Sequence, residues 1–457
     1  MTIARDIAKY VSSVSFSDLP KEAVHSAKRS LVDTFGCAIG AFNAEPVRIA
    51  RATLKDIESR YSATLLGTHY KTDASFAAFV NGTMARYFDY NDTYDGKEFS
   101  HPSDNIFPIL AVVEAQKGTG KDVILGITLA YELQCRLADA ASLWKHGWDH
   151  VTYGLVSVSA VAARLMGLRE EKIEQAINIA LNSHITMRQV RAGELSMWKA
   201  PAFANSARNA IFAAELARNG MTGPSPVFEG ENGFWKLVSG RFSLDTKKFG
   251  NRRNRFKIGQ NLFKFYPAET RAQTAISCAI EAVKNVAGVD AIKRVVVETN
   301  EAGYKILGKD PEKWHPLTKE TADHSLPYLV AVSLLDKDVD LSSTSERRIG
   351  DRKTLNLMKR IQVAENKKYT ALFNKGGTVN AAGIRIVLKD GSSIHKEQIY
   401  SRGHPKNPMS DEELAEKFID LSSDVMSRSR AEYILETIWK IEKMDSIDRL
   451  FSIAVLS

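Results

Sequence analysis

Residues 21–42, KEAVHSAKRSLVDTFGCAIGAF, predict a long amphipathic helix. Apolar side chains recur there every three or four residues, from Val24 through Leu31 to Ala38, and this spacing is the period of an α-helix. The same period returns in other segments of the first half of the chain, at residues 74–88, 106–116, 123–137, 155–166 and 201–218. The N-terminal half is therefore predicted to consist of packed helices.

The pattern changes after about residue 250. Strand-like runs occur at residues 295–298 (VVVE) and 384–388 (IRIVL). The second run passes through Lys389-Asp390-Gly391, a hairpin turn signal, into another strand-like run at 393–399. Helical patterns cover residues 270–286 and 324–335, and the pattern is helical again from residue 410. This mixture of helices and strands predicts a small α+β unit.

The chain has 457 residues, and single hydrophobic cores stop growing beyond about 250–300 residues. We therefore expect a mostly α protein with a smaller α+β domain. The predicted parts are a large all-helical domain at 1–257, an α+β lid domain at 258–402 and C-terminal helices at 403–457. A segment as short as the last one makes a poor independent core, so its helices are predicted to return to the helical domain.

Composition limits the class of protein. The 62 basic and 54 acidic residues give a net charge of +8, which favours an anionic partner. The basic residues are dispersed, which argues against nucleic acid. Neither a signal peptide nor an apolar run of about 20 residues is present, so no membrane association is expected. The three cysteines show no disulfide or metal spacing, as is typical of a cytoplasmic protein.

Two segments combine histidine with acidic residues. Residues 87–107, YFDYNDTYDGKEFSHPSDNIF, place Asp89 and Thr93 one helical turn apart and His101 in an irregular stretch behind them. Residues 148–154, WDHVTYG, place His150 before an apolar helix. A carboxylate and an imidazole can form an acid–base pair. A capped surface turn and a buried core histidine would show the same residue types at these positions. Residue types alone therefore leave both interpretations open.

Two further segments carry cations. Arg191 and Lys199 precede the long helix predicted at 201–218, and positive groups near a helix N-terminus can form an anion site. Lys264 stands among aromatic residues in LFKFYP, where it would be desolvated or lie over a ring. A solvated basic turn and a surface lysine are the alternatives. Searches for a P-loop, G-x-G-x-x-G, H-E-x-x-H and G-x-S-x-G find none. These features indicate a site for a small anion without a metal or a cofactor.

At these same segments the sequence resembles the MmgE/PrpD family. The similarity runs through most of the chain, and the matching blocks occur in the family's order. They are DYNDTY with HPSDNI, DHVTYG, RAGELSMWKAPAFANSARN with GMTGP and FEG, LFKFYPAETRAQTA, and ETADHSLPYLVAVSLLD. The resemblance implies a large helical domain, an α+β lid, C-terminal helices that rejoin the first domain, and a homodimer without metal or cofactor.

The resemblance also implies an activity. Members of the family include 2-methylcitrate dehydratase, cis-aconitate decarboxylase and an iminodisuccinate epimerase, which act on small polycarboxylates next to a carboxylate. We therefore expect a metal-independent hydro-lyase that dehydrates 2-methylcitrate or citrate, with a place in propionate catabolism. A decarboxylase or an epimerase on the same site, and a non-catalytic binding protein, are the alternatives.

Site residues are carried over from the matching motifs. Asp89 and Thr93 match through DYNDT, and His101 matches through HPS. The remaining three match through DHV, WKA and FKFYP: His150, Lys199 and Lys264. We expect His101 to transfer the substrate proton and His150 to act as the acid or to bind a carboxylate, with the reverse assignment left open. The cations, including Arg191, are expected to bind substrate carboxylates.

Overall fold

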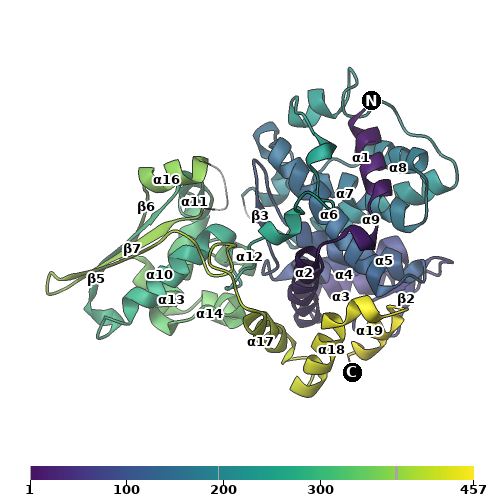
Figure 1. Ribbon diagram of the computed structural model, residues 1–457. Helices are drawn as coiled ribbons and strands as arrows, with labels where there is room; N and C mark the ends of the chain where they lie inside the picture. Colours follow the sequence, from purple (N-terminus) through teal and green to yellow (C-terminus); the bar gives the residue numbers. More distant parts are fainter. Residues whose placement is uncertain (1, 194, 376–378, 457) are drawn as a thin grey trace.

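The computed structural model describes residues 2–193, 195–375 and 379–456 (Figure 1). Its first hydrophobic core contains residues between Ile3 and Phe263 together with residues between Met409 and Ala454. The second core contains residues between Tyr266 and Ile386. We call the parts around these cores the helical domain and the α+β domain. A mostly helical fold with a smaller α+β part is thus confirmed, whereas the boundaries at 257 and 402 stay predictions.

The long helices of the helical domain overlap the segments where the sequence shows the helical period, although α6 extends beyond its predicted segment at both ends and α7 begins two residues earlier, and α1, α3 and α8 occur in addition. In chain order they are α1 Ile3–Ser13, α2 Lys21–Gly40, α3 Glu45–Leu54, α4 Ala74–Tyr87, α5 Ile106–Ala115, α6 Gly120–Ala140, α7 Tyr153–Leu165, α8 Glu170–Ser183 and α9 Pro201–Arg218. Short strands pair as β1 Ser62–Thr64 with β2 Lys71–Asp73, and as β3 Tyr94–Asp95 with β4 Phe99–Ser100.

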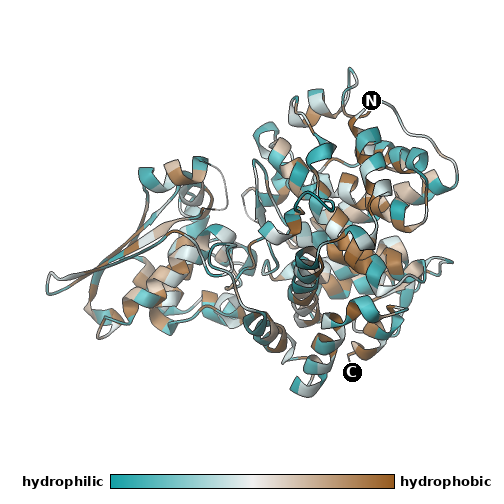
Figure 2. Ribbon diagram, in the orientation of Figure 1, coloured by the Kyte–Doolittle hydropathy of each residue, from teal (hydrophilic) through white to brown (hydrophobic). Residues whose placement is uncertain are grey.

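Helix α9 packs against both α4 and α7 in the helical domain. Small residues allow the close approach. A side chain at Gly82 of α4 would place its Cβ 3.0 Å from Ala204 of α9, and one at Gly154 of α7 would lie 2.7 Å from the Phe203 ring. Core packing at this density leaves no room for such additions. The brown apolar segments of Figure 2 accordingly gather on the inner helices.

The C-terminal helices pack on the helical domain, as predicted. They are α17 Asp411–Ser422, α18 Arg428–Trp439 and α19 Asp448–Ile453. Helix α17 lies along α2 (Figure 1), where the buried Phe418 ring covers Gly36. The Lys417 ammonium donates to the Asp33 carboxylate of α2 and to the backbone carbonyl oxygens of Tyr90 and Lys264, at 2.7–2.8 Å. One buried cation thus ties α17 to α2 and to the two segments that carry Asp89 and Lys264.

The α+β domain contains a four-stranded sheet in the order β6-β5-β7-β8. Its strands are β5 Ile292–Thr299, β6 Ile361–Glu365, β7 Ala382–Leu388 and β8 Ser393–Gln398. Strands β5 and β6 are parallel and the other neighbours are antiparallel. The predicted hairpin is β7–β8, and Gly391 has a φ of 90° in its turn, a conformation that glycine adopts without steric cost.

Helices α10 Gln273–Val283 and α13 Leu326–Asp336 pack on each other and on the sheet. The shorter helices are α11 Glu301–Leu307, α12 Lys319–Ala322, α14 Glu346–Ile349, α15 Arg352–Met358 and α16 Lys367–Asn374. The sequence pattern predicts a helix from residue 324, but α13 begins at Leu326. The Ser325 hydroxyl caps it by accepting from the Tyr328 N–H, and Pro327 lies in its first turn. Proline favours the first turn of a helix, and because Ser325 is the cap, His324 lies in the turn between α12 and α13.

Among the described residues, none of the helices is both long enough and apolar enough to cross a membrane. Cys37, Cys135 and Cys278 are buried, free thiols.

Candidate active site

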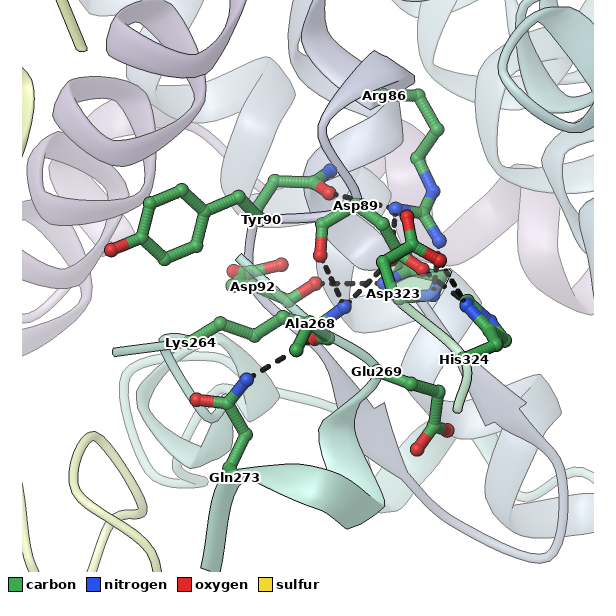
Figure 3. Close-up of polar contacts among 12 residues, drawn as sticks. Arg86, Asp89, Tyr90, Asp92, Lys264, Ala268, Glu269, Gln273, Asp323 and His324 are labelled. Carbon is green, nitrogen blue, oxygen red and sulfur yellow. Dashed lines mark hydrogen bonds and ion pairs between the residues drawn. The ribbon is translucent and has the colours of Figure 1, made fainter. Parts of the chain in front are cut away.

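Asp89 lies just beyond α4, at the junction of the two domains. Its φ is 51°, a left-handed conformation that aspartate tolerates better than most residues. Its N–H donates to the Arg86 carbonyl oxygen at 3.1 Å. This turn ends the helix and directs the buried carboxylate toward the α+β domain (Figure 3).

Three cations surround the Asp89 carboxylate. Lys264 Nζ lies 2.6 Å from Oδ1, Arg86 Nη1 lies 2.5 Å from Oδ1, and Lys199 Nζ lies 3.2 Å from Oδ2. Lys264 also donates to the Asp89 carbonyl oxygen at 2.5 Å. Burial opposes ionisation, but the Arg86, Lys264 and Lys199 charges hold the pKa of Asp89 well below its usual range. Asp89 is therefore an anion, and the structure brings it together with two other predicted site residues, Lys199 and Lys264.

His101 is joined to this group through Arg86, a residue that the sequence did not single out. Arg86 Nη2 lies 2.6 Å from His101 Nε2, and His101 Nδ1 lies 3.0 Å from the Asp92 carbonyl oxygen. Since a carbonyl only accepts, Nδ1 carries the proton and Nε2 accepts from Arg86. Burial and the Arg86 charge lower the pKa of His101 far below its usual value. Both ring nitrogens are thus engaged in a neutral imidazole, and its role in proton transfer stays a prediction.

Thr93 is fully buried beside this group. Its backbone exchanges two hydrogen bonds with Leu262, at 2.8 and 2.9 Å, so it positions the chain that leads to Lys264. Its Oγ1 has no hydrogen-bond partner among the described residues. A hydroxyl without a partner can serve a ligand, and the predicted binding role of Thr93 is compatible with this position.

His150 and Arg191 form a second group around Asp149. The fully buried Asp149 carboxylate lies 3.0 Å from Arg188 Nη1, 3.0 Å from Arg191 Nε and 3.3 Å from His150 Nδ1. Burial lowers the pKa of His150 to about 3, so its imidazole is neutral. Its Nε2 has no hydrogen-bond partner within the described part of the chain. The His150 and His101 rings lie 5.5 Å apart, which joins this group to the first.

The α+β domain contributes two residues that the sequence reasoning missed, Asp323 and His324. Asp323 Oδ1 lies 2.5 Å from His324 Nδ1 and 3.4 Å from Lys199 Nζ, and Oδ2 lies 3.4 Å from Lys319 Nζ. His324 Nε2 lies 3.6 Å from Asp89 Oδ2. Figure 3 shows both side chains directed toward Asp89. An acidic residue and a histidine directly before a capped helix were the available signal, inside a block already matched to the family.

A metal ion fits this group poorly. Asp89, Asp323 and His324 offer ligand atoms within 4.8 Å of one another. Both carboxylates, however, already have the Lys199 ammonium beside them, at 3.2 and 3.4 Å. A divalent cation would have to displace that ammonium, and breaking a buried ion pair by removing one partner is strongly destabilising. The chemistry of the donor set therefore favours lysine charges over a metal.

Comparison with known protein families matches both parts of the chain. Residues 5–247 match the MmgE/PrpD N-terminal domain and residues 266–443 match the MmgE/PrpD C-terminal domain. The chain belongs to the MmgE/PrpD family. We call Asp89 and the charged residues around it (Arg86, Lys199, Lys264, Asp323 and His324) the Asp89 group. This group spans both matched regions, because Arg86, Asp89 and Lys199 lie in the first whereas Asp323 and His324 lie in the second. Lys264 lies between the two.

Relatives in the MmgE/PrpD family cover most of the chain. A 2-methylcitrate dehydratase of Salmonella typhimurium is 29% identical over 423 residues, which are 88% of this chain and 86% of that protein. A probable 2-methylcitrate dehydratase of Saccharomyces cerevisiae is 28% identical, over 88% of this chain and 81% of that protein. A cis-aconitate decarboxylase of Homo sapiens is 24% identical, over 97% of this chain and 92% of that protein.

Proposed function

We propose that this protein is a hydro-lyase that removes water from 2-methylcitrate or a related hydroxy-tricarboxylate without a metal ion. The main observation is the group of buried cations at the domain junction, where Lys199, Lys264 and Arg86 surround one carboxylate. A small substrate with several carboxylates needs such charges. The names of the similar 2-methylcitrate dehydratases support the choice of reaction.

The cations would also serve the chemical step. Removal of a proton next to a carboxylate develops negative charge on that carboxylate. Lys199 bridges Asp89 and Asp323, with distances of 3.2 and 3.4 Å, and can turn toward an entering anion. Positive charges in a water-poor site stabilise the transition state, in which negative charge develops, more than they stabilise the ground state.

Proton removal requires a base. His150 suits this role because its imidazole is neutral and its Nε2 has no partner among the described residues. The Asp149 carboxylate beside Nδ1 keeps the proton on Nδ1, so that Nε2 can accept one. His101 is the alternative base if Arg86 releases its Nε2. Arg191, paired with Asp149 at 3.0 Å, would bind a carboxylate at the edge of the site.

Decarboxylation of cis-aconitate is a second candidate, because the human relative with that name matches 97% of the chain. It would use the same cations to hold the remaining carboxylates. Epimerisation of an amino-dicarboxylate and a non-catalytic binding role are weaker candidates. We also propose a homodimer, as the family resemblance implies, and a cytoplasmic protein that binds neither nucleic acid nor membranes, as its composition and cysteine usage indicate. Sedimentation of the purified protein and fractionation of cells would check these points.

The test offers purified protein 2-methylcitrate, citrate and cis-aconitate separately. Ultraviolet absorbance follows the conjugated double bond, and mass spectrometry identifies the product. A rise in absorbance with 2-methylcitrate or citrate is the expected result. Loss of absorbance with cis-aconitate together with released carbon dioxide would instead establish a decarboxylase. Absence of turnover with all three acids would overturn the proposal.

A further inference from the structure

The α+β domain contributes His324 to the site. This histidine lies between α12 and α13, with Nδ1 2.5 Å from the Asp323 carboxylate and Nε2 3.6 Å from Asp89 Oδ2. Because a carboxylate only accepts, the Asp323 contact keeps Nδ1 protonated and fixes the ring. Nε2 then faces the Asp89 group with no hydrogen-bond partner among the described residues.

Solvent exposure of the side chain distinguishes His324 from His101 and His150. His101 and His150 are both almost completely buried, whereas 14% of the His324 side chain is exposed. His101 also has both ring nitrogens engaged. Of these three rings, His324 is therefore the partly exposed one, and a ligand entering between the domains can contact its Nε2 without displacing a protein hydrogen bond.

The charged neighbours of His324 act in opposite directions. Asp323, on the same turn, and Asp89, from the helical domain, both favour the imidazolium. Lys199 of the segment before α9 opposes it, with Nζ 3.4 Å from Nδ1, and Lys319 of α12 pairs with Asp323. Burial and Lys199 together lower the pKa of free His324. A bound tricarboxylate would add negative charges beside the ring and raise that pKa again, so that protonation follows substrate binding.

We propose that His324, with Asp323 as its positioning residue, is the general acid that protonates the hydroxyl group leaving the substrate. This inference rests on the proposed function. It places the base, His150, on the helical domain and the acid on the α+β domain, so that the reaction requires both domains around one substrate.

The step balances in atoms and electrons. The base takes the proton from the carbon next to a carboxylate, and the C–H electron pair becomes the second bond of the new carbon–carbon double bond. The C–O bond breaks at the neighbouring carbon, and the departing oxygen takes the Nε2 proton of His324 and leaves as water. His324 ends neutral and the base ends protonated, so that exchange with solvent restores both groups before the next turnover.

The experiment compares His324→Gln and Asp323→Asn with His315→Gln. His315 is exposed and precedes α12 in the same domain, which makes it a matched control. His324→Gln should lower kcat by about 10²–10⁴-fold, as expected for loss of a general acid. In the wild type, loss of the His324 proton should make kcat/KM fall as the pH rises, and His324→Gln should abolish this fall. Asp323→Asn should move that fall to lower pH by about one unit, since it removes the anion that favours the imidazolium. His315→Gln should change neither quantity.

A binding measurement distinguishes a variant that has lost the chemical step from one that has lost its fold. Tricarballylate has the three carboxylates of citrate but no hydroxyl to lose, and its Kd for His324→Gln should stay within about threefold of wild type. An active wild type whose His324→Gln variant loses less than about tenfold in kcat, or keeps the alkaline fall, would overturn this assignment alone. A wild type without dehydratase activity would overturn the proposed function and this assignment together.

Discussion

Lys264 holds Asp89 by two atoms at once, donating to its carboxylate at 2.6 Å and to its backbone carbonyl at 2.5 Å. The two residues are 175 positions apart in the chain. The contact fixes the left-handed turn after α4 and the start of the α+β domain in one arrangement. It also places a buried cation where we propose that a substrate carboxylate binds.

Asp89→Asn should destabilise the protein by about 3–5 kcal/mol, because it leaves buried cations without their counter-ion. Urea unfolding followed by circular dichroism measures the change. The control is Asp245→Asn, which alters the exposed Asp245–Lys248 pair at 3.7 Å and should cost less than about 1 kcal/mol. Equal losses in the two variants would contradict a stabilising role for the Asp89 group.

Glu98→Gln should change how stability depends on pH. Burial raises the pKa of Glu98 to about 7, whereas the unfolded value is about 4.3. Between these values the folded protein holds a proton that the unfolded chain has released. Stability is therefore full below this window and falls as the pH rises through it, by up to about 1.4 kcal/mol per pH unit.

The variant should remove this contribution and flatten the curve of unfolding free energy between pH 4.5 and about 7. An amide oxygen can still accept from the Leu143 and Trp144 N–H groups, which lie 2.6 and 3.1 Å from Oε2. Glu416→Gln alters an exposed carboxylate and serves as the control. A slope that Glu98→Gln leaves unchanged would show that Glu98 is ionised throughout.

His150→Gln should lower kcat by about 10²–10⁴-fold with a small change in KM, if its free Nε2 is the base. Steady-state kinetics with the substrate that the wild type turns over provides the measurement. His69→Gln is the control, because His69 is exposed and distant in sequence from every site residue. A raised KM with kcat nearly unchanged would instead make His150 a binding residue.

Lys199→Met should weaken tricarballylate binding by about 10- to 100-fold, because a hydrogen bond from a charged group contributes about 1.5–3 kcal/mol. The change also leaves Asp89 and Asp323 without the ammonium between them, and their charges then repel the ligand. Calorimetric titration gives Kd. Lys236→Met, at an exposed position, should bind as the wild type does, and unaltered binding by Lys199→Met would remove Lys199 from the site.

Treatment with EDTA should leave the activity unchanged, and added Mg²⁺ or Zn²⁺ should not raise it. Asp89 and Asp323 are already neutralised by lysine and arginine charges, so a metal ion would gain little there. The assay uses protein dialysed against chelator and buffer without metal. Activity that disappears on dialysis and returns with one divalent ion would contradict a metal-independent reaction.

Local sequence patterns were sufficient to predict much of the fold. The apolar spacing of residues 21–42 predicted α2 Lys21–Gly40, and the Lys389-Asp390-Gly391 turn predicted the β7–β8 hairpin. Helical period and turn chemistry act over a few residues, so they can be read directly. The start of α13 was placed two residues early, because the helical pattern does not mark the first residue of the helix, which the Ser325 cap sets.

The sequence by itself determined the family and the helical character of both ends, and it predicted seven candidate site residues, because each depends on short motifs in the chain. The tertiary structure decided which of these side chains touch. It joined Lys264 to Asp89, engaged both nitrogens of His101 and brought Asp323 and His324 across the domain junction. Contacts between residues far apart in the chain depend on how whole helices and the sheet pack, and no local pattern encodes that packing.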